Sequence, residues 1–170
     1  MALSFLTSSD QTLDVVATCD SSVTADEAQR SAYLESGDLN QLGKVGKDAT
    51  KFTLKALSPA EREEAEARAG ALTRSELGRL LWTEAPTDTM ERAQWHHKLS
   101  DDEREAMSDY QAYLNRVYKE MINASLTHID GAEASADQLE LIRPEAHRIQ
   151  TVSELVLHIQ RISLLGLEGK

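Results

Sequence analysis

The stretch that decides the fold is Lys51-Phe52-Thr53-Leu54-Lys55-Ala56-Leu57-Ser58-Pro59-Ala60-Glu61-Arg62, where a strand pattern changes into a helix pattern. From Phe52 to Ala56 apolar and polar residues alternate, and this period of two is typical of a strand with one buried face. Ser58 then suits a helix N-cap, and Glu61, three residues later, can return a hydrogen bond to that cap. We therefore predict a strand that leads directly into a capped helix.

The region before this joint carries weaker signals of the same kind. Residues 15–18 have the β-branched composition of a short strand. The capping box Thr24-Ala25-Asp26-Glu27 predicts a short helix, and Gly37 suits the left-handed residue that ends it. Residues 39–47 are expected to form a loop. The first third of the chain should therefore hold two to four short strands.

The region after the joint is predominantly helical. The longest predicted helix begins at Ser100, which is followed by three acidic residues, and should run to about Ala124. Between the helices, residues 126–131 are expected to be extended and to end in a turn, while Pro144 either closes one helix or opens the next. Other helix starts are expected at Thr73, near Thr87 or Thr89 after a break at Pro86, at Ser135 and at Thr151, with ends at Gly70 and Gly166.

These patterns predict an α+β fold that is mostly α. A small β-containing region (1–57) would precede a body of five to six helices (58–170). We expect the 170 residues to form a single domain, with the loop at 37–50 as the only plausible boundary.

The composition of the chain limits the kinds of partner that it can bind. The formal net charge is −11, from 29 acidic and 18 basic residues, so the surface should repel nucleic acid and anionic membranes. No apolar run approaches the roughly 18–20 residues that span a bilayer. Cys19 is the single cysteine, which excludes an intrachain disulfide. We expect neither a nucleic-acid nor a membrane partner.

The residues that could carry chemistry do not form a recognisable catalytic pattern. His96-His97 lies close to Asp101-Asp102, but adjacent helical histidines project about 100° apart and lack the i, i+4 spacing of a zinc helix. The acids at 101–105 suit the first turn of a helix. We therefore expect no catalytic residue, no metal and no cofactor. We keep as an alternative a metal-dependent enzyme that uses His96, His97 or the neighbouring acids.

The apolar residues of the helices say more about function than the candidate catalytic residues do. Stripes on the 100–124 and 151–165 helices can bury against each other, while a leucine-rich patch at 77–82 needs a partner. We expect a groove between the 73–82, 100–124 and 151–165 helices to receive an apolar helix of another protein. The predicted partner-binding residues are Leu77, Leu80, Leu81, Trp82, Trp95, Leu155, Ile159 and Ile162.

The layout resembles the small tail assembly chaperones and accessory structural proteins of tailed bacteriophages. The passage Phe52-Thr53-Leu54-Lys55-Ala56-Leu57-Ser58-Pro59-Ala60-Glu61 is similar to their strand-then-helix opening. The closing Glu154-Leu155-Val156-Leu157-His158-Ile159-Gln160-Arg161-Ile162-Ser163-Leu164-Leu165 is similar to their C-terminal amphipathic helix, and the helical middle also corresponds. The long segment before residue 50 departs from that pattern and suits a virion component as well.

The resemblance implies a non-enzymatic protein that works through protein–protein contacts. A tail chaperone would coat the tape measure protein in the host cytoplasm before the tail tube polymerises. A permanent neck or tail component of the virion is the first alternative, and a cellular adaptor protein is another. The implied partners are tape measure or tube proteins, and we expect a homo-oligomer.

Overall fold

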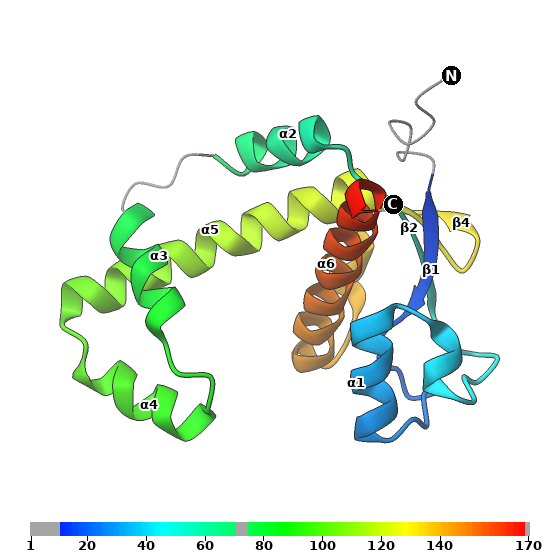
Figure 1. The fold of residues 1–170 in the computed structure, drawn as a ribbon, viewed down its shortest axis with the longest axis horizontal. Helices are drawn as coiled ribbons and strands as arrows, with labels where there is room; N and C mark the ends of the chain where they lie inside the picture. Colours follow the sequence, from blue (N-terminus) through cyan, green and yellow to red (C-terminus); the bar gives the residue numbers. More distant parts are fainter. Residues whose placement is uncertain (1–10, 71–74, 169–170) are drawn as a thin grey trace. The chain divides into compact units, whose positions relative to one another are not determined.

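The computed structural model describes residues 11–70 and 75–168 (Figure 1). The protein is α+β and mostly α, as the sequence predicts. Its contacts group into two compact units. Unit 1 combines the chain up to Ala65 with the chain from Tyr118 onward, and unit 2 is Glu66–Val117. From the sequence we expected a single domain, and nothing in the sequence indicated these two units.

The elements of unit 1 come from both ends of the chain. Two helices, α2 (Pro59–Ala69) and α5 (Asp101–Ser125), have residues in both units. The remaining elements of unit 1 are β1 (Thr12–Val16), α1 (Glu27–Ser36), η3 (Leu39–Leu42), β2 (Lys51–Lys55), β3 (Leu126–Ile129), β4 (Ala132–Glu133), η4 (Ala136–Leu141) and α6 (Glu145–Glu168). Those of unit 2 are α3 (Ser75–Glu84) and α4 (Thr89–Lys98).

The four strands form one antiparallel sheet in the order β1-β2-β3-β4. The predicted strand at 51–56 is confirmed as β2, whose buried Phe52 and Leu54 alternate with more exposed neighbours. In the register, Val15 lies opposite Phe52, and Leu126 lies opposite Leu54 beyond a bulge. The extended piece predicted at 126–131 is confirmed as β3, which pairs with β2 and turns into β4.

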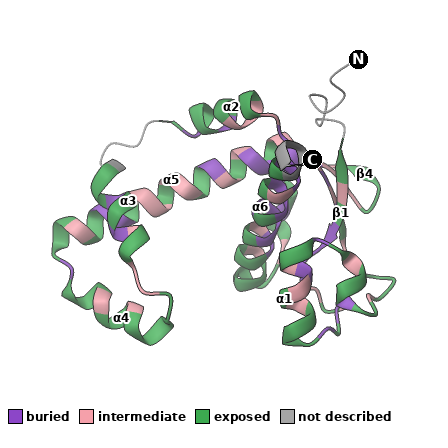
Figure 2. Ribbon diagram, in the orientation of Figure 1, coloured by how far each residue is buried: buried purple, intermediate pink, exposed green. Residues whose placement is uncertain are grey.

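Helix α6 packs against the sheet, and its buried side chains form much of the core of unit 1. It contacts β1 and β2, and its buried positions recur at helical spacing (Figure 2). Leu155 and Ile159 have exposed fractions of 1% and 0%. Each such side chain contributes roughly 1.5–3 kcal/mol by leaving water. The packing of α6 on the sheet is therefore a major source of the stability of unit 1.

The joint at 51–62 has the predicted capping chemistry. The Ser58 hydroxyl accepts a hydrogen bond from the Glu61 amide at 3.2 Å, and the Glu61 carboxylate accepts from the Ser58 amide at 2.8 Å. Lys55 of β2 also donates to Glu61 at 2.8 Å. The Lys55 hydrogen bond and the Ser58 amide together lower the pKa of Glu61. Strand β2 and helix α2 are thus tied together across the short connection between them.

Other helix ends agree in part with the prediction. The cap at Ser100 and the left-handed Gly37, with φ of 74°, are confirmed. Helix α1 is capped by Asp26 rather than Thr24, because the Asp26 carboxylate accepts from the Gln29 amide. The predicted loop at 39–47 contains η3, and the predicted start at Thr73 lies outside the described residues.

For the last helix, the alternative in which Pro144 opens it is confirmed, whereas the predicted start at Thr151 and the predicted end at Gly166 were wrong. Helix α6 begins at Glu145, directly after Pro144, and continues past Gly166 to Glu168. Thr151 does not act as a cap, since it lies inside the helix and its hydroxyl donates to the His147 carbonyl at 2.8 Å.

A buried polar cluster joins the end of β1 to α6. The Glu154 carboxylate, 6% exposed, accepts from the Thr18 amide at 2.7 Å and from the Thr18 hydroxyl at 2.5 Å. Gln150, one helical turn earlier, donates its amide to both partners. A buried carboxylate is tolerated when its oxygens accept several hydrogen bonds. This cluster fixes the position of β1 along α6.

A second buried polar group lies between α6 and α1. The His158 ring is 1% exposed, lies 4.9 Å from the Tyr33 ring, and has its Nδ1 at 2.9 Å from Arg161 Nη1. Its Nε2 has no hydrogen-bond partner among the described residues. Burial, and secondarily the Arg161 charge, lower the pKa of His158 to about 4. The Tyr33 hydroxyl exchanges hydrogen bonds with both backbone groups of Val16 at 3.1 Å.

We predict that His158 makes unit 1 less stable in mild acid. The unfolded chain takes up a proton near the ordinary pKa of 6.5, whereas the folded chain does so only near 4. The contribution is therefore complete above pH 6.5 and falls as the pH drops from 6.5 to 4, by about 3 kcal/mol in total. Urea unfolding of unit 1 across this range should show a flatter profile for His158→Phe than for the wild type. The exposed control His96→Gln should keep the wild-type slope, and parallel curves for His158→Phe and wild type would contradict the assignment.

We also predict a large cost for Glu154→Ala. The substitution leaves the Thr18 amide, the Thr18 hydroxyl and the Gln150 amide without their shared acceptor, at a cost of about 2–4 kcal/mol in the free energy of unfolding. Urea unfolding followed by circular dichroism would measure it. Glu133→Ala, at an exposed position of β4, is the control and should change the free energy by less than about 0.5 kcal/mol.

Candidate functional site

The predicted partner-binding residues divide between the two units. Leu155, Ile159 and Ile162 belong to unit 1 and are buried, with exposed fractions of 1%, 0% and 8%. The chain's own sheet and helices cover them, and these side chains therefore have no surface to offer a partner in this structure. The other five belong to unit 2. The predicted groove would combine helices that belong to different units.

Unit 2 has a small apolar core of its own. This cluster consists of Leu81 of α3, Leu99 at the end of α4 and Met107 of α5. Trp82 and Trp95 pack against it while staying partly exposed. The Trp82 ring also lies 6.2 Å from the Tyr110 ring and 5.1 Å from the Arg92 guanidinium. Three of the predicted residues, Leu81, Trp82 and Trp95, thus take part in holding α3, α4 and α5 together.

Helix α3 approaches α5 very closely at Gly78. A Cβ atom at Gly78 would lie 2.4 Å from the Ala106 carbonyl oxygen and 2.9 Å from Tyr110 Cβ. Only glycine permits this approach, because any side chain would overlap the α5 backbone. Gly78 and Leu81 face α5 together, one helical turn apart, and this contact determines which side of α3 is turned outward.

The outward side of α3 carries Leu77 and Leu80. Their exposed fractions are 44% and 53%, and their spacing of three places them side by side on the helix. We call these two residues the α3 apolar edge. Met90 at the start of α4 is 69% exposed. Single exposed apolar residues are ordinary, but an adjacent pair on a firmly positioned helix is a candidate contact surface.

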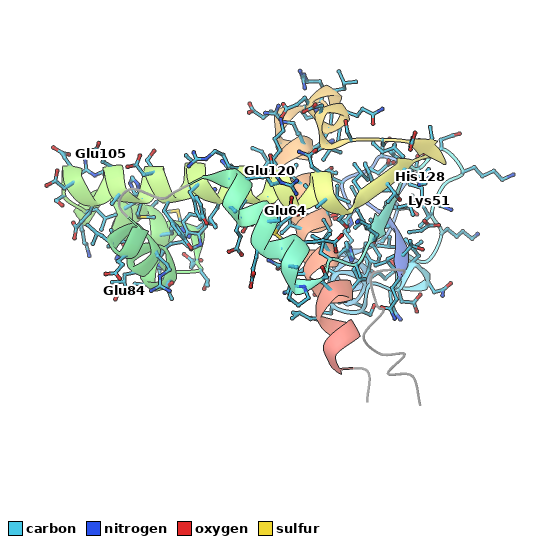
Figure 3. All side chains as sticks on the ribbon, turned by 90° about the horizontal axis from the view of Figure 1, so that it is seen from above. Lys51, Glu64, Glu84, Glu105, Glu120 and His128 are labelled. Carbon is cyan, nitrogen blue, oxygen red and sulfur yellow. The ribbon has the colours of Figure 1, made fainter. Side chains whose placement is uncertain are left out.

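Charged residues accompany the α3 apolar edge. Glu76 and Glu84 lie near the two ends of α3, and Arg79 lies between the two leucines; all three are exposed. Figure 3 shows Glu84 and Glu105 at the outside of unit 2. An apolar strip with a charged rim is the usual composition of a protein–protein contact surface.

The histidines and acids considered for a metal do not come together. His96 and His97 are exposed in the last turn of α4, and Asp101 pairs with Arg104 at 2.9 Å. Hydrogen bonds from the Ser100 amide and hydroxyl lower the pKa of Glu103, which acts as a capping residue. Within residues 11–70 and 75–168, no group of three or more His, Cys, Asp or Glu has an arrangement that could hold a metal ion.

Unit 1 contains a cavity of about 530 Å³ that the sequence did not reveal. Apolar side chains from β2, β3, η4 and the segment after η4 form much of its wall, and polar groups come from the segment after β1 and from the start of α6. The residues most relevant to binding are Cys19, Asp20, Phe52, Ile129, Arg143 and His147. They are far apart in the sequence, and no local motif connects them.

Comparison with protein-family models, curated proteins and solved structures finds no significant match in any of the three. None of the helices in the described ranges is both long and apolar enough to cross a bilayer.

We predict that Gly78→Ala loosens unit 2. The added methyl group must push α3 away from Ala106 and Tyr110, at a cost of about 1–3 kcal/mol. Both tryptophans of the chain, Trp82 and Trp95, lie in unit 2, so tryptophan fluorescence during urea unfolding reports on this unit. Ser108→Ala, an exposed change on α5, is the control and should leave the midpoint in place. An unchanged midpoint for Gly78→Ala would show that the close approach is absent in solution.

Proposed function

We propose that this chain is a non-enzymatic assembly protein of a tailed bacteriophage that binds a partner helix through unit 2. Within that class we favour a tail assembly chaperone whose partner is the tape measure protein. The observation that carries the proposal is the α3 apolar edge, where Leu77 and Leu80 point outward from a helix held against α5 by Gly78. The resemblance of the 52–61 and 154–165 stretches to phage tail proteins supplies the class of partner.

The mechanism that we propose is burial of apolar side chains of the tape measure protein against this edge. A long helical protein that waits for its tube exposes apolar residues that would otherwise aggregate. Covering them with Leu77 and Leu80 removes apolar surface from water on both proteins. The net charge of −11 would keep the resulting complex soluble.

A permanent neck or tail component would use the same surface. The two roles differ in whether the chain stays in the particle after assembly. Mass spectrometry of purified virions distinguishes them, since peptides of a transient chaperone should be absent from mature particles and peptides of a structural component should be present in fixed stoichiometry.

The proposal is tested by co-expressing the full chain with the tape measure gene from the same genome. We expect the wild-type chain to keep the tape measure protein soluble and to co-purify with it. The double variant Leu77→Glu, Leu80→Glu should weaken the complex by roughly 100-fold or more, because two apolar contacts of about 1.5 kcal/mol each are lost.

Leu157→Glu is the matched control. Leu157 is also an exposed leucine, at 40%, but it lies on α6 in unit 1. This variant should bind as the wild type does. Equal binding by the double variant and the wild type would contradict the assignment of the surface, and the failure of the wild-type chain to bind or solubilise any tail protein of that genome would contradict the proposed function.

A further inference from the structure

The cavity of unit 1 is the feature that the proposed function does not use. Its volume of about 530 Å³ lies within the range of about 300–1,000 Å³ that is usual for small-molecule sites. Phe52, Ile129, Leu139 and Ile142 give it an apolar wall, and the exposed Leu141 lies at its border. Such a wall favours the apolar body of a ligand, and its polar groups then decide which head group is accepted.

Among the described residues, Asp20 is the only one that contributes a carboxylate to the cavity wall, and both of its oxygens already accept hydrogen bonds. Its Oδ1 accepts a hydrogen bond from the Ser22 amide at 2.8 Å, and its Oδ2 accepts from the Thr50 amide at 3.0 Å. These bonds hold the loop after β1 against the start of β2. Asp20 is thus committed to the protein's own backbone and has less capacity to receive a cationic ligand.

The donors that line the cavity are less committed. Arg143 uses Nη1 for the carbonyls of Glu140 and Ile142, at 2.6 and 2.9 Å, and among the described residues no acceptor takes a hydrogen bond from its Nε or Nη2. The exposed His147 ring, on the first turn of α6, likewise has no partner in the described part of the chain. A guanidinium held by one nitrogen can still offer its remaining donors to an acceptor.

We propose that this cavity binds a small molecule with an apolar body and a single carboxylate. The apolar body lies against Phe52 and Ile129, and the carboxylate accepts hydrogen bonds from Arg143 and His147. The position of Cys19 in the same wall makes the site measurable. Its thiol lies 3.5 Å from the Thr151 hydroxyl and 3.6 Å from the His147 carbonyl oxygen, and it is the only cysteine of the chain.

Alkylation of Cys19 by iodoacetamide therefore reports whether the cavity is occupied. The full chain is titrated with 4-phenylbutyrate, with 4-phenylbutanol and with 4-phenylbutylamine, which share one apolar body and differ in the head group. We expect the carboxylate to slow alkylation at the lowest concentration, the alcohol at a concentration about tenfold higher, and the amine least. Backbone amide NMR shifts should move at Thr50 and Ile129 and stay in place in unit 2.

The variant Arg143→Gln should weaken protection by 4-phenylbutyrate about tenfold and leave protection by 4-phenylbutanol unchanged, which also shows that the cavity is intact. His147→Gln tests the second donor in the same way. The control Arg79→Gln removes an exposed arginine of α3 and should have no effect.

Two results would overturn the proposal. Equal protection by the acid and the alcohol, unchanged in Arg143→Gln, would show that the head group is not recognised. Alkylation that none of the three compounds slows, together with unmoved NMR shifts, would show that the cavity is not a binding site. Neither result bears on tape measure binding, which depends on unit 2.

Discussion

The burial of the α6 stripe against the sheet is the constraint on which the rest of the structure depends. It joins residues 145–163 to strands that begin at Thr12, and it draws the extended piece at 126–129 into the same sheet. The Thr18–Glu154 cluster fixes this packing, because the two residues lie 136 positions apart and share two short hydrogen bonds. Residues 66–117 between these segments form a unit with a core of their own.

This constraint also determines which apolar residues the chain itself buries. The apolar stripe of α6 is a clear amphipathic signal in the sequence, but the chain itself buries the stripe residues Leu155, Ile159 and Ile162. The apolar residues that remain exposed are fewer and include the edge formed by Leu77 and Leu80. Its position depends on a glycine contact rather than on a large core, so a small change at Gly78 should affect the surface and the stability of unit 2 together.

Local patterns were sufficient to predict much of the fold. The strand at 51–55, the caps at Ser58 and Ser100, and the helix to Ser125 follow from alternation and capping chemistry within a few residues. The sheet partners of β2 could not be predicted, because a short extended piece such as Leu126–Ile129 carries no signal of what it pairs with. For the same reason the sequence does not show which distant segments group into each unit.

The candidate sites were harder to predict from the sequence than the fold was. An amphipathic stripe shows that one face of a helix will be buried but not whether the same chain or a partner buries it, so Leu155 and Leu77 looked equivalent. The cavity depends on residues from five separate segments, and no spacing rule connects Cys19 with Arg143.

We propose that α3 of unit 2, and not the buried face of α6 in unit 1, is the surface for a partner. Amide hydrogen exchange of the chain, alone and in its soluble complex with the tape measure protein, tests this claim most directly. We expect slower exchange at residues 75–84 in the complex and unchanged exchange in the sheet and α6. Slower exchange confined to α6 and the sheet, with α3 unchanged, would contradict it.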